Sequence, residues 1–253
     1  MTDSTNIQPP NSTKPKLYRH LLRRLRLLVS TRPTLYAFYA RLARLQFQMT
    51  DRTSVVVDSY PRSANSFFEA AFTRSHGGRE VVAHHSHAAA QVLAGVKRGL
   101  PCIVLLREPE AAIASFYEMS GGDYPIELCT REYSVFYTSL LPVIDKLIIV
   151  ETEQIEARFH DLMVYLRDKH GLAVEPYEID AAMHSELLLA VDETGRHRNG
   201  FAIERYSETL SKVEKQSRRE RLDAIRTQIR APQNATQLAR CRTVYQEFKS
   251  HGF

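Results

Sequence analysis

Short apolar runs alternate with helical patterns through the middle of the chain. Four runs of mainly aliphatic residues predict buried strands, at 54–58, 80–83, 102–106 and 146–150. Apolar positions at helical spacing predict the helices between and after them, over 65–74, 88–99, 109–119, 125–141 and 155–169. Buried strands that alternate with helices are typical of a parallel sheet with helices on both faces. We therefore expect a single α/β domain with a central parallel sheet over residues 51–253.

The two ends of the chain differ from this alternating region. Residues 1–16 are polar and predict a disordered tail, whereas 17–50 carry leucines and arginines at helical spacing and predict two basic amphipathic helices. These helices either cap the domain or, through residues 17–31, rest on an anionic membrane surface. Residues 191–205 lack periodicity and predict a loop, and two helices are expected after it, broken at Pro232.

The composition narrows the function classes only slightly. The net charge of +5 permits an anionic ligand, nucleic acid or an anionic membrane as partner. The three cysteines are far apart and include no CxxC pair, which argues for a reducing compartment and against a thiolate metal site. Since no apolar stretch approaches about 18 residues and the N-terminus lacks a signal-peptide pattern, we expect a cytoplasmic protein, with peripheral contact at the inner membrane surface as the alternative.

A polar turn joins the first predicted strand to the helix that follows it. It reads SYPRSANSF over residues 59–67. In open parallel sheets, ligands bind beyond the carboxyl ends of the strands, where helix N-termini present unpaired N–H groups to anions. Arg62 adds a fixed positive charge at this point, and Ser63, Asn65 and Ser66 add short side-chain donors. The turn therefore predicts an anion site, with a capped helix and a surface arginine as the purely structural alternative.

A second basic residue ends the third predicted strand. Arg107 follows the run at 102–106, and Ser115 lies eight positions later in the next predicted helix. Arginine offers planar, charge-assisted hydrogen bonds and serine offers one donor, so the pair can bind one phosphate together. The nucleoside triphosphate motif G-x-x-x-x-G-K-[ST] is absent, which argues against a magnesium-dependent phosphate loop.

Taken together, the two elements resemble those of the PAPS-dependent sulfotransferases, whose sulfuryl donor is 3′-phosphoadenosine 5′-phosphosulfate (PAPS). The resemblance covers about residues 54–230 and implies a P-loop-like phosphate-binding loop after the first strand. The loop that grips the 5′-phosphosulfate would comprise Arg62, Ser63, Ala64, Asn65, Ser66 and Phe67. Arg107 and Ser115 would grip the 3′-phosphate. Ala64 replaces the usual glycine, and Phe67 either packs on the adenine, as the family implies, or packs in the core.

Three histidines, His84, His85 and His87, lie at the second predicted strand. On a strand, His85 and His87 would share one face and His84 would point away. Polar filling at the strand end is one interpretation, and a metal site is another, although the sequence shows no nearby acidic or cysteine partner. The family carries Lys-Thr-His here, which implies that His87 is the general base for the acceptor proton. His85 would stand in the position of the lysine, and it remains the alternative base.

The resemblance also implies the overall reaction. A late basic loop supplies a further phosphate contact in the family, and Arg198 and Gly200 match it, with a basic surface loop as the alternative. A sulfuryl group would pass from PAPS to a hydroxyl or amine of a small-molecule, lipid or glycan acceptor, leaving the desulfated nucleotide PAP. Arg62 would stabilise charge on the leaving phosphate, and no metal is expected.

Two other function classes stay open at this point. A nucleotide-dependent phosphotransferase on a related fold is one, although the missing G-K-[ST] argues against it. A non-catalytic basic protein that binds membranes or nucleic acid is the other, and residues 17–31 favour it. With a sulfotransferase, nucleic acid is not expected as a partner. No motif bears on the acceptor or on the oligomeric state.

Overall fold

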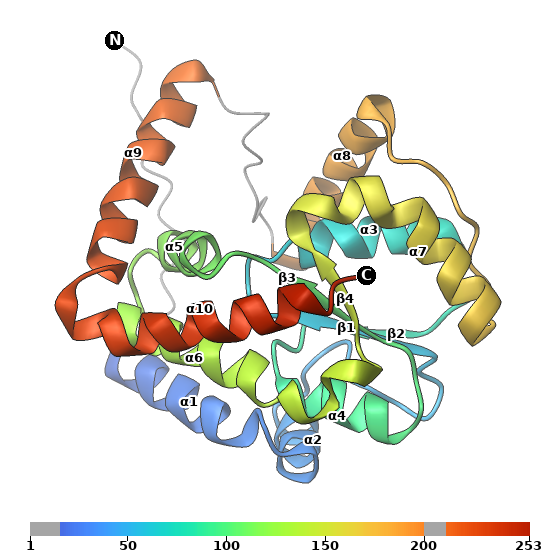
Figure 1. The fold of residues 1–253 in the computed structure, drawn as a ribbon, viewed down its shortest axis with the longest axis horizontal. Helices are drawn as coiled ribbons and strands as arrows, with labels where there is room; N and C mark the ends of the chain where they lie inside the picture. The colour runs from blue at the N-terminus through green and yellow to red at the C-terminus, as the bar shows by residue number, and fades with distance from the viewer. Residues whose placement is uncertain (1–15, 200–210) are drawn as a thin grey trace.

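The computed structural model describes the backbone of residues 16–199 and 211–253 and the side chains of 20–193 and 211–253 (Figure 1). Four parallel strands form its sheet, in the order β2-β1-β3-β4. Their bounds are β1 Val55–Ser59, β2 Val82–His84, β3 Cys102–Leu106 and β4 Ile148–Glu151. The predicted parallel α/β architecture is therefore confirmed, with each strand within two residues of its expected start.

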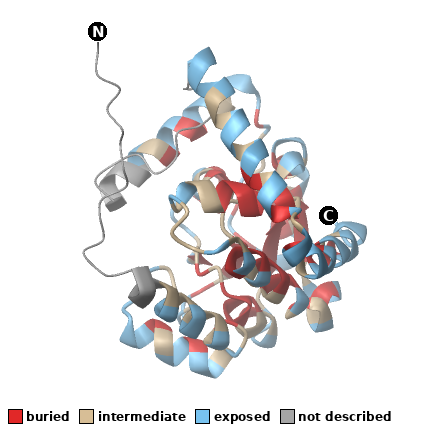
Figure 2. Ribbon diagram, turned by 90° about the vertical axis from the view of Figure 1, so that its left-hand side faces the viewer, coloured by how far each residue is buried: buried red, intermediate tan, exposed pale blue. Residues whose placement is uncertain are grey.

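Alternate residues of the strands enter two different apolar clusters. Val55 and Val57 of β1 face one cluster, and Val56 between them faces the other. Because both faces are covered, every residue of β1 and β3 is buried, which explains the unbroken apolar runs in the sequence. Figure 2 shows the buried residues concentrated at the centre of the molecule and the outward helix faces exposed.

Helices cover both faces of the sheet (Figure 1). One cluster takes residues of α3 Asn65–His76, α7 Ile155–His170 and α8 Ala181–Asn199. The other takes residues of α4 Ala89–Lys97, α5 Pro109–Met119, α6 Ile126–Thr138, α9 Lys212–Ile229 and α10 Ala235–Ser250. Short 3₁₀ turns occupy Leu141–Lys146, Thr152–Gln154 and Pro232–Asn234. The predicted break at Pro232 is confirmed.

The two N-terminal helices predicted from the leucine and arginine spacing are present. They are α1 Lys16–Val29 and α2 Pro33–Leu42, and Pro33 is the first residue of α2, where its fixed φ suits a helix start. The disordered tail predicted for residues 1–16 lies outside the described residues, except that Lys16 begins α1. Among the described helices, none is both long enough and apolar enough to cross a membrane.

The loop predicted over residues 191–205 is wrong in its first half. Helix α8 continues to Asn199, so residues 191–199 are helical, and the remainder lies outside the described residues. Leu187, Leu188 and Val191 are buried and attach this helix to the core. Past such an anchor, each further helical residue adds a hydrogen bond at little entropic cost, so the helix extends into sequence without apolar periodicity.

All three cysteines lie in the interior of the molecule. Cys102, Cys129 and Cys241 are free thiols with no exposed surface, and all belong to the apolar cluster that contains α5 and α6. Burial raises the pKa of each thiol to about 12. The thiols therefore act as small apolar core residues.

Candidate functional site

The strand order places a topological switch point at the carboxyl ends of β1 and β3, the position at which open α/β sheets form their crevice. The chain passes from β1 to β2 on one side and returns to place β3 on the other side of β1. Helix α3 after β1 and helix α5 after β3 lie on opposite faces of the sheet, so the chain leaves these two strand ends in opposite directions. Ligands bind at such a switch point in open α/β sheets. Both sequence elements singled out for phosphate, at Arg62 and at Arg107, follow these two strands.

The turn after β1 adopts a tight conformation without glycine. Arg62 and Ala64 have φ angles of 68° and 59°, in the left-handed region, and α3 begins at Asn65. For a residue with a Cβ atom this conformation costs about 1–2 kcal/mol. Ala64 thus holds the geometry that a glycine would adopt freely. Ser63 is fully buried beneath the turn, so the expected phosphate donor at this position does not lie on the surface of the crevice.

Arg62, Arg107 and Ser115 come together in the crevice. The Nε atom of Arg62 donates to the Oγ atom of Ser115 over 3.2 Å, and Nη1 of Arg107 donates to the carbonyl oxygen of Arg62 over 2.6 Å. Ser115 is buried within α5, and the hydroxyl of Tyr133 holds the carbonyl oxygen of Arg107 at 2.7 Å. The sequence predicted that these three residues would serve one nucleotide, and the fold brings them into mutual contact.

The guanidinium group of Arg107 is incompletely satisfied. Its Nε atom is buried and has no hydrogen-bond partner among the described residues. Burial lowers the pKa of Arg107, against the attraction of Glu153 and together with repulsion from Arg62 and two other arginines. A buried cationic donor without a partner is costly, and an anion that binds it recovers a charge-assisted hydrogen bond. The crevice therefore suits an anionic ligand.

His87 has a defined tautomer. Its Nδ1 atom lies 2.9 Å from the carbonyl oxygen of Ser59, which can only accept a hydrogen bond. This contact is shorter than the 3.3 Å between Nδ1 and the amide nitrogen of Asn65, so we assign the proton to Nδ1 and the lone pair to Nε2. Burial, together with the charges of His85 and Arg26, lowers the pKa of His87 well below 6.5. The ring is therefore neutral at neutral pH and can accept a proton at Nε2.

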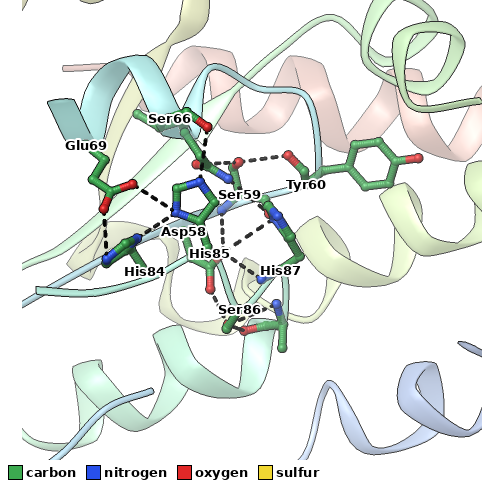
Figure 3. Close-up of polar contacts among 12 residues, drawn as sticks. Asp58, Ser59, Tyr60, Ser66, Glu69, His84, His85, Ser86 and His87 are labelled. Carbon is green, nitrogen blue, oxygen red and sulfur yellow. Dashed lines mark hydrogen bonds and ion pairs between the residues drawn. The ribbon is translucent and has the colours of Figure 1, made fainter. Parts of the chain in front are cut away.

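Asp58, which the sequence did not single out, positions this histidine (Figure 3). The carboxylate is fully buried and accepts hydrogen bonds from the backbone N–H of Ser59 and of His87, each over 2.9 Å, and from the hydroxyl of Ser86. Burial raises its pKa to about 6 although these hydrogen bonds oppose the shift. The signal in the sequence was an acidic residue inside a run of buried valines, which requires partners wherever it occurs.

The other two histidines lie differently from the prediction. Strand β2 ends at His84, and His85 and His87 have left-handed φ angles of 54° and 46°. The strand alternation expected for HHSH is therefore wrong: His84 does not point away from His85. Both rings face the carboxylate of Glu69 on α3, with His84 Nε2 at 3.2 Å and His85 Nδ1 at 3.5 Å (Figure 3). Ser66 contacts the Nε2 atom of His85 over 3.3 Å.

Glu69 supplies the acidic partner that was missing in the sequence. One ligand atom from each of Glu69, His84 and His85 lies within 4.8 Å of the others, and two histidines with a carboxylate are donors that zinc accepts. The Nδ1 atoms of His84 and His85 also lie 2.6 Å apart, a distance that requires a shared proton. Metal binding to histidine releases such a proton in any case, so the same three residues can form a hydrogen-bonded cluster or hold a cation.

Of the remaining predicted donor contacts, Phe67 and Asn65 have partners within the fold, and the last two lie outside the described residues. Phe67 is buried in the core cluster of α3, with its ring centroid 5.3 Å from that of His184, which corresponds to the core-packing alternative. Asn65 lies at the start of α3, where its side chain accepts from Ser59 and contacts His87. The side chain of Arg198 and all of Gly200 lie outside the described residues.

Comparisons with known proteins provide no match on which a function could rest. No protein-family model matches the sequence, and a search of curated proteins finds no significant similarity. The functional argument therefore depends on the residues of the crevice and their geometry.

Proposed function

We propose that the protein transfers a sulfuryl group from PAPS to a hydroxyl or amine of an acceptor, leaving PAP. One observation carries the proposal. Two sequence elements that resemble the donor contacts of sulfotransferases lie far apart in the chain, and Arg62 of one hydrogen-bonds to Ser115 of the other at the switch point of the sheet. His87, which follows the neighbouring strand β2, is neutral and carries its lone pair on Nε2.

The donor nucleotide would use the positive charge of the crevice. Arg107 and Ser115 would bind the 3′-phosphate, and the partnerless Nε of Arg107 supports this role. Arg62, Ser66 and the backbone N–H groups at the start of α3 would bind the 5′-phosphosulfate in the manner of a P-loop-like turn. The phosphate groups would replace the present contacts of Arg62 and Arg107 by charge-assisted hydrogen bonds to an anion.

The chemistry would be an in-line displacement at sulfur. The acceptor oxygen forms a bond to sulfur while its proton passes to Nε2 of His87. The bond between sulfur and the bridging oxygen breaks, and its electron pair stays on the phosphate of PAP. Arg62 and the turn N–H groups would stabilise that charge, and Ser59 and Asp58 would hold the imidazolium that forms. His85 lies beside Ser66 and would contact the leaving group.

A thermal-shift and calorimetric comparison of nucleotides tests the donor assignment. PAP and PAPS should raise the melting temperature of the full chain, whereas ATP and AMP, which lack the 3′-phosphate, should do so far less. A chain that responds to ATP with magnesium and not to PAP would be a phosphotransferase, and the proposal would be wrong. Transfer of radiolabelled sulfur from PAPS to acceptors then tests catalysis.

A further inference from the structure

The outer face of the two N-terminal helices carries a dense group of exposed apolar side chains. Of the eleven large hydrophobic residues exposed in the described part of the chain, seven belong to α1 and α2. They are Leu21, Leu22, Leu25, Leu28, Leu35, Phe38 and Leu42, between 40% and 69% exposed. Three on α1 and three on α2 follow helical spacing and form stripes. Scattered exposed apolar residues are ordinary, but a contiguous group marks an interaction surface.

The charges around these stripes are of one sign. Residues 16–50 contain eight lysines and arginines and no aspartate or glutamate. Arg24, Arg32, Arg41 and Arg44 are exposed beside the apolar side chains. An apolar stripe flanked by arginine is the pattern of a helix that lies in the interface of an anionic bilayer. A second copy of the chain is a poor partner, because a twofold contact would bring the same arginines face to face.

The inner face of α1 is fixed to the body of the protein. Arg23 forms two hydrogen bonds to the carboxylate of Glu132 on α6, over 2.7 and 2.6 Å, and its guanidinium lies 4.5 Å from the ring centroids of Phe116 and Tyr124. Arg26 donates to the carbonyl oxygen of Ser86 over 2.5 Å. Helix α1 is therefore packed against the body of the protein, and its inner face contacts Ser86, the residue immediately before His87.

This inner face also forms one wall of a small cavity beside His87. Arg23, Arg26 and Leu27 of α1 contribute that wall, together with Ser30 directly after the helix. Tyr60, Pro61, His87, Glu132 and Phe136 line the rest. An interfacial helix sits about 5–10 Å deep in the bilayer boundary, and a helix is about 10–12 Å across. With its outer face in the lipid, α1 would hold the cavity beside His87 close to the level of the headgroups.

We propose that the outer face of α1 and α2 docks on an anionic lipid bilayer, and that the acceptor presented to His87 is a hydroxyl of a phospholipid headgroup. The second half rests on the proposed sulfuryl transfer, whereas the first half stands on the apolar stripes and the arginines alone. The atoms balance as in the reaction above: the headgroup oxygen gains the sulfuryl group, its proton passes to His87, and PAP leaves.

Vesicle flotation tests the docking half. The full chain should bind vesicles of phosphatidylcholine mixed with phosphatidylglycerol, and should bind pure phosphatidylcholine far more weakly. The double variant Leu25→Glu with Leu28→Glu should lose at least about tenfold in vesicle affinity, because it places charge in the apolar stripe. Leu189→Glu and Val213→Glu are matched controls, since both side chains are exposed, at 68% and 74%, on other helices. Both controls should bind like the wild type.

Three results would overturn the docking half. The full chain could ignore anionic vesicles, the controls could lose binding as much as the double variant, or the double variant could convert a dimer to a monomer in a chain that binds no vesicles. The last result would assign the face to a second copy of the chain. An unchanged melting temperature shows that the double variant folds, and unchanged PAP affinity, measured by calorimetry, shows that it keeps its nucleotide site.

Radiolabelled PAPS tests the acceptor half. Label should enter the lipid extract from vesicles that contain phosphatidylglycerol or phosphatidylinositol, and not from vesicles of phosphatidylmethanol, which is anionic but has no headgroup hydroxyl. No label in lipid from either hydroxyl-bearing headgroup would overturn this half. A chain that binds vesicles but has no affinity for PAP would instead contradict the proposed function and leave the docking surface in place.

Discussion

The Nε atom of Arg62 lies 3.2 Å from the Oγ atom of Ser115, although 53 residues separate them in the sequence. The contact joins the turn after β1 to the helix after β3, and Arg107 secures it through the carbonyl oxygen of Arg62. Two short elements, each of which has a structural explanation, thus meet at one cationic position on the carboxyl edge of the sheet. A nucleotide with phosphate groups at both its 3′ and 5′ positions would span this contact.

Replacement of Arg107 by alanine should weaken PAP binding by about 2–4 kcal/mol, because a charged phosphate partner is lost. In the free protein the Nε atom gives up no hydrogen bond, so the change there removes only the contact of Nη1 with the carbonyl oxygen of Arg62. Isothermal calorimetry of Arg107→Ala measures the affinity, and Arg167→Ala, an exposed arginine on α7, is the control. Equal PAP affinity in Arg107→Ala and the control would remove Arg107 from the donor site.

Loss of His87 should affect turnover and spare donor binding. A general base contributes about 10²–10⁴-fold to rate, so His87→Ala should lower kcat by that factor with PAP affinity nearly unchanged. His85→Ala should weaken both, since His85 contacts Ser66 in the donor turn. Full turnover in His87→Ala, with an inactive His85→Ala that still binds PAP, would exchange the two roles.

The pH dependence of the rate follows from the buried position of His87. Its pKa lies well below 6.5, so the ring stays neutral through the whole neutral range. The rate should therefore be flat from about pH 6.5 upward and decline only in more acidic buffer. A kcat that still rises between about pH 7 and 8 would mean that another group, of higher pKa, takes the proton.

Asp58 should make the stability of the protein depend on pH in a recognisable way. Its pKa is 3.8 ordinarily and about 6 in the folded chain, so between these values the folded state binds the proton more readily and stability from this group falls as pH rises. Asp58→Asn lacks this loss. The unfolding free energy of Asp58→Asn minus that of the wild type should therefore increase by about 2–3 kcal/mol between about pH 4 and a pH above 6.

Denaturant titrations of both proteins at several pH values measure this difference. The hydrogen bonds of Asp58 that asparagine reproduces poorly add an offset that does not vary with pH, so only the slope matters. His87, whose pKa is lowered, acts in the opposite direction in both proteins. A difference between them that stays constant with pH would show that Asp58 is charged in both states.

The Arg23–Glu132 pair should be important for stability. Only 14% and 11% of the two side chains are exposed, so removal of one partner leaves a buried charge. Glu132→Gln and Arg23→Ala should each cost about 3–5 kcal/mol, and a double replacement by apolar residues should recover much of the loss. Arg74→Ala breaks an exposed pair with Glu186 and should cost about 1 kcal/mol at most. Similar losses in both pairs would contradict this account.

The strands and most helices could be predicted because burial on both faces of the sheet produces continuous apolar runs in the sequence. Val55, Val56 and Val57 are apolar without alternation since each face of β1 meets a helix layer. The end of α8 could not be predicted in the same way. The sequence after Val191 carries no apolar period, and the helical backbone continues there from a buried anchor that lies before it.

The site was harder to predict than the fold. The sequence pointed to Arg62, Arg107 and Ser115 because a basic residue directly after a buried strand is unusual. The carboxyl ends of parallel strands also share one edge of the sheet. The left-handed backbone at His85 and His87 could not be predicted, because the usual sequence indicator of this conformation is glycine and neither position has one. Without it, the contact of both His84 and His85 with Glu69 could not be derived from strand alternation.

The three natural cysteines are buried, so a cysteine introduced at the surface could be labelled selectively. With a pKa of about 12, each thiol is ionised in about one molecule in 10⁵ at pH 7, and none has exposed surface. Alkylating reagents should therefore react with these thiols only when the core opens, and the rate of alkylation would report how often it opens. A single cysteine introduced at an exposed position such as Leu25 could carry a fluorophore without removal of the natural three.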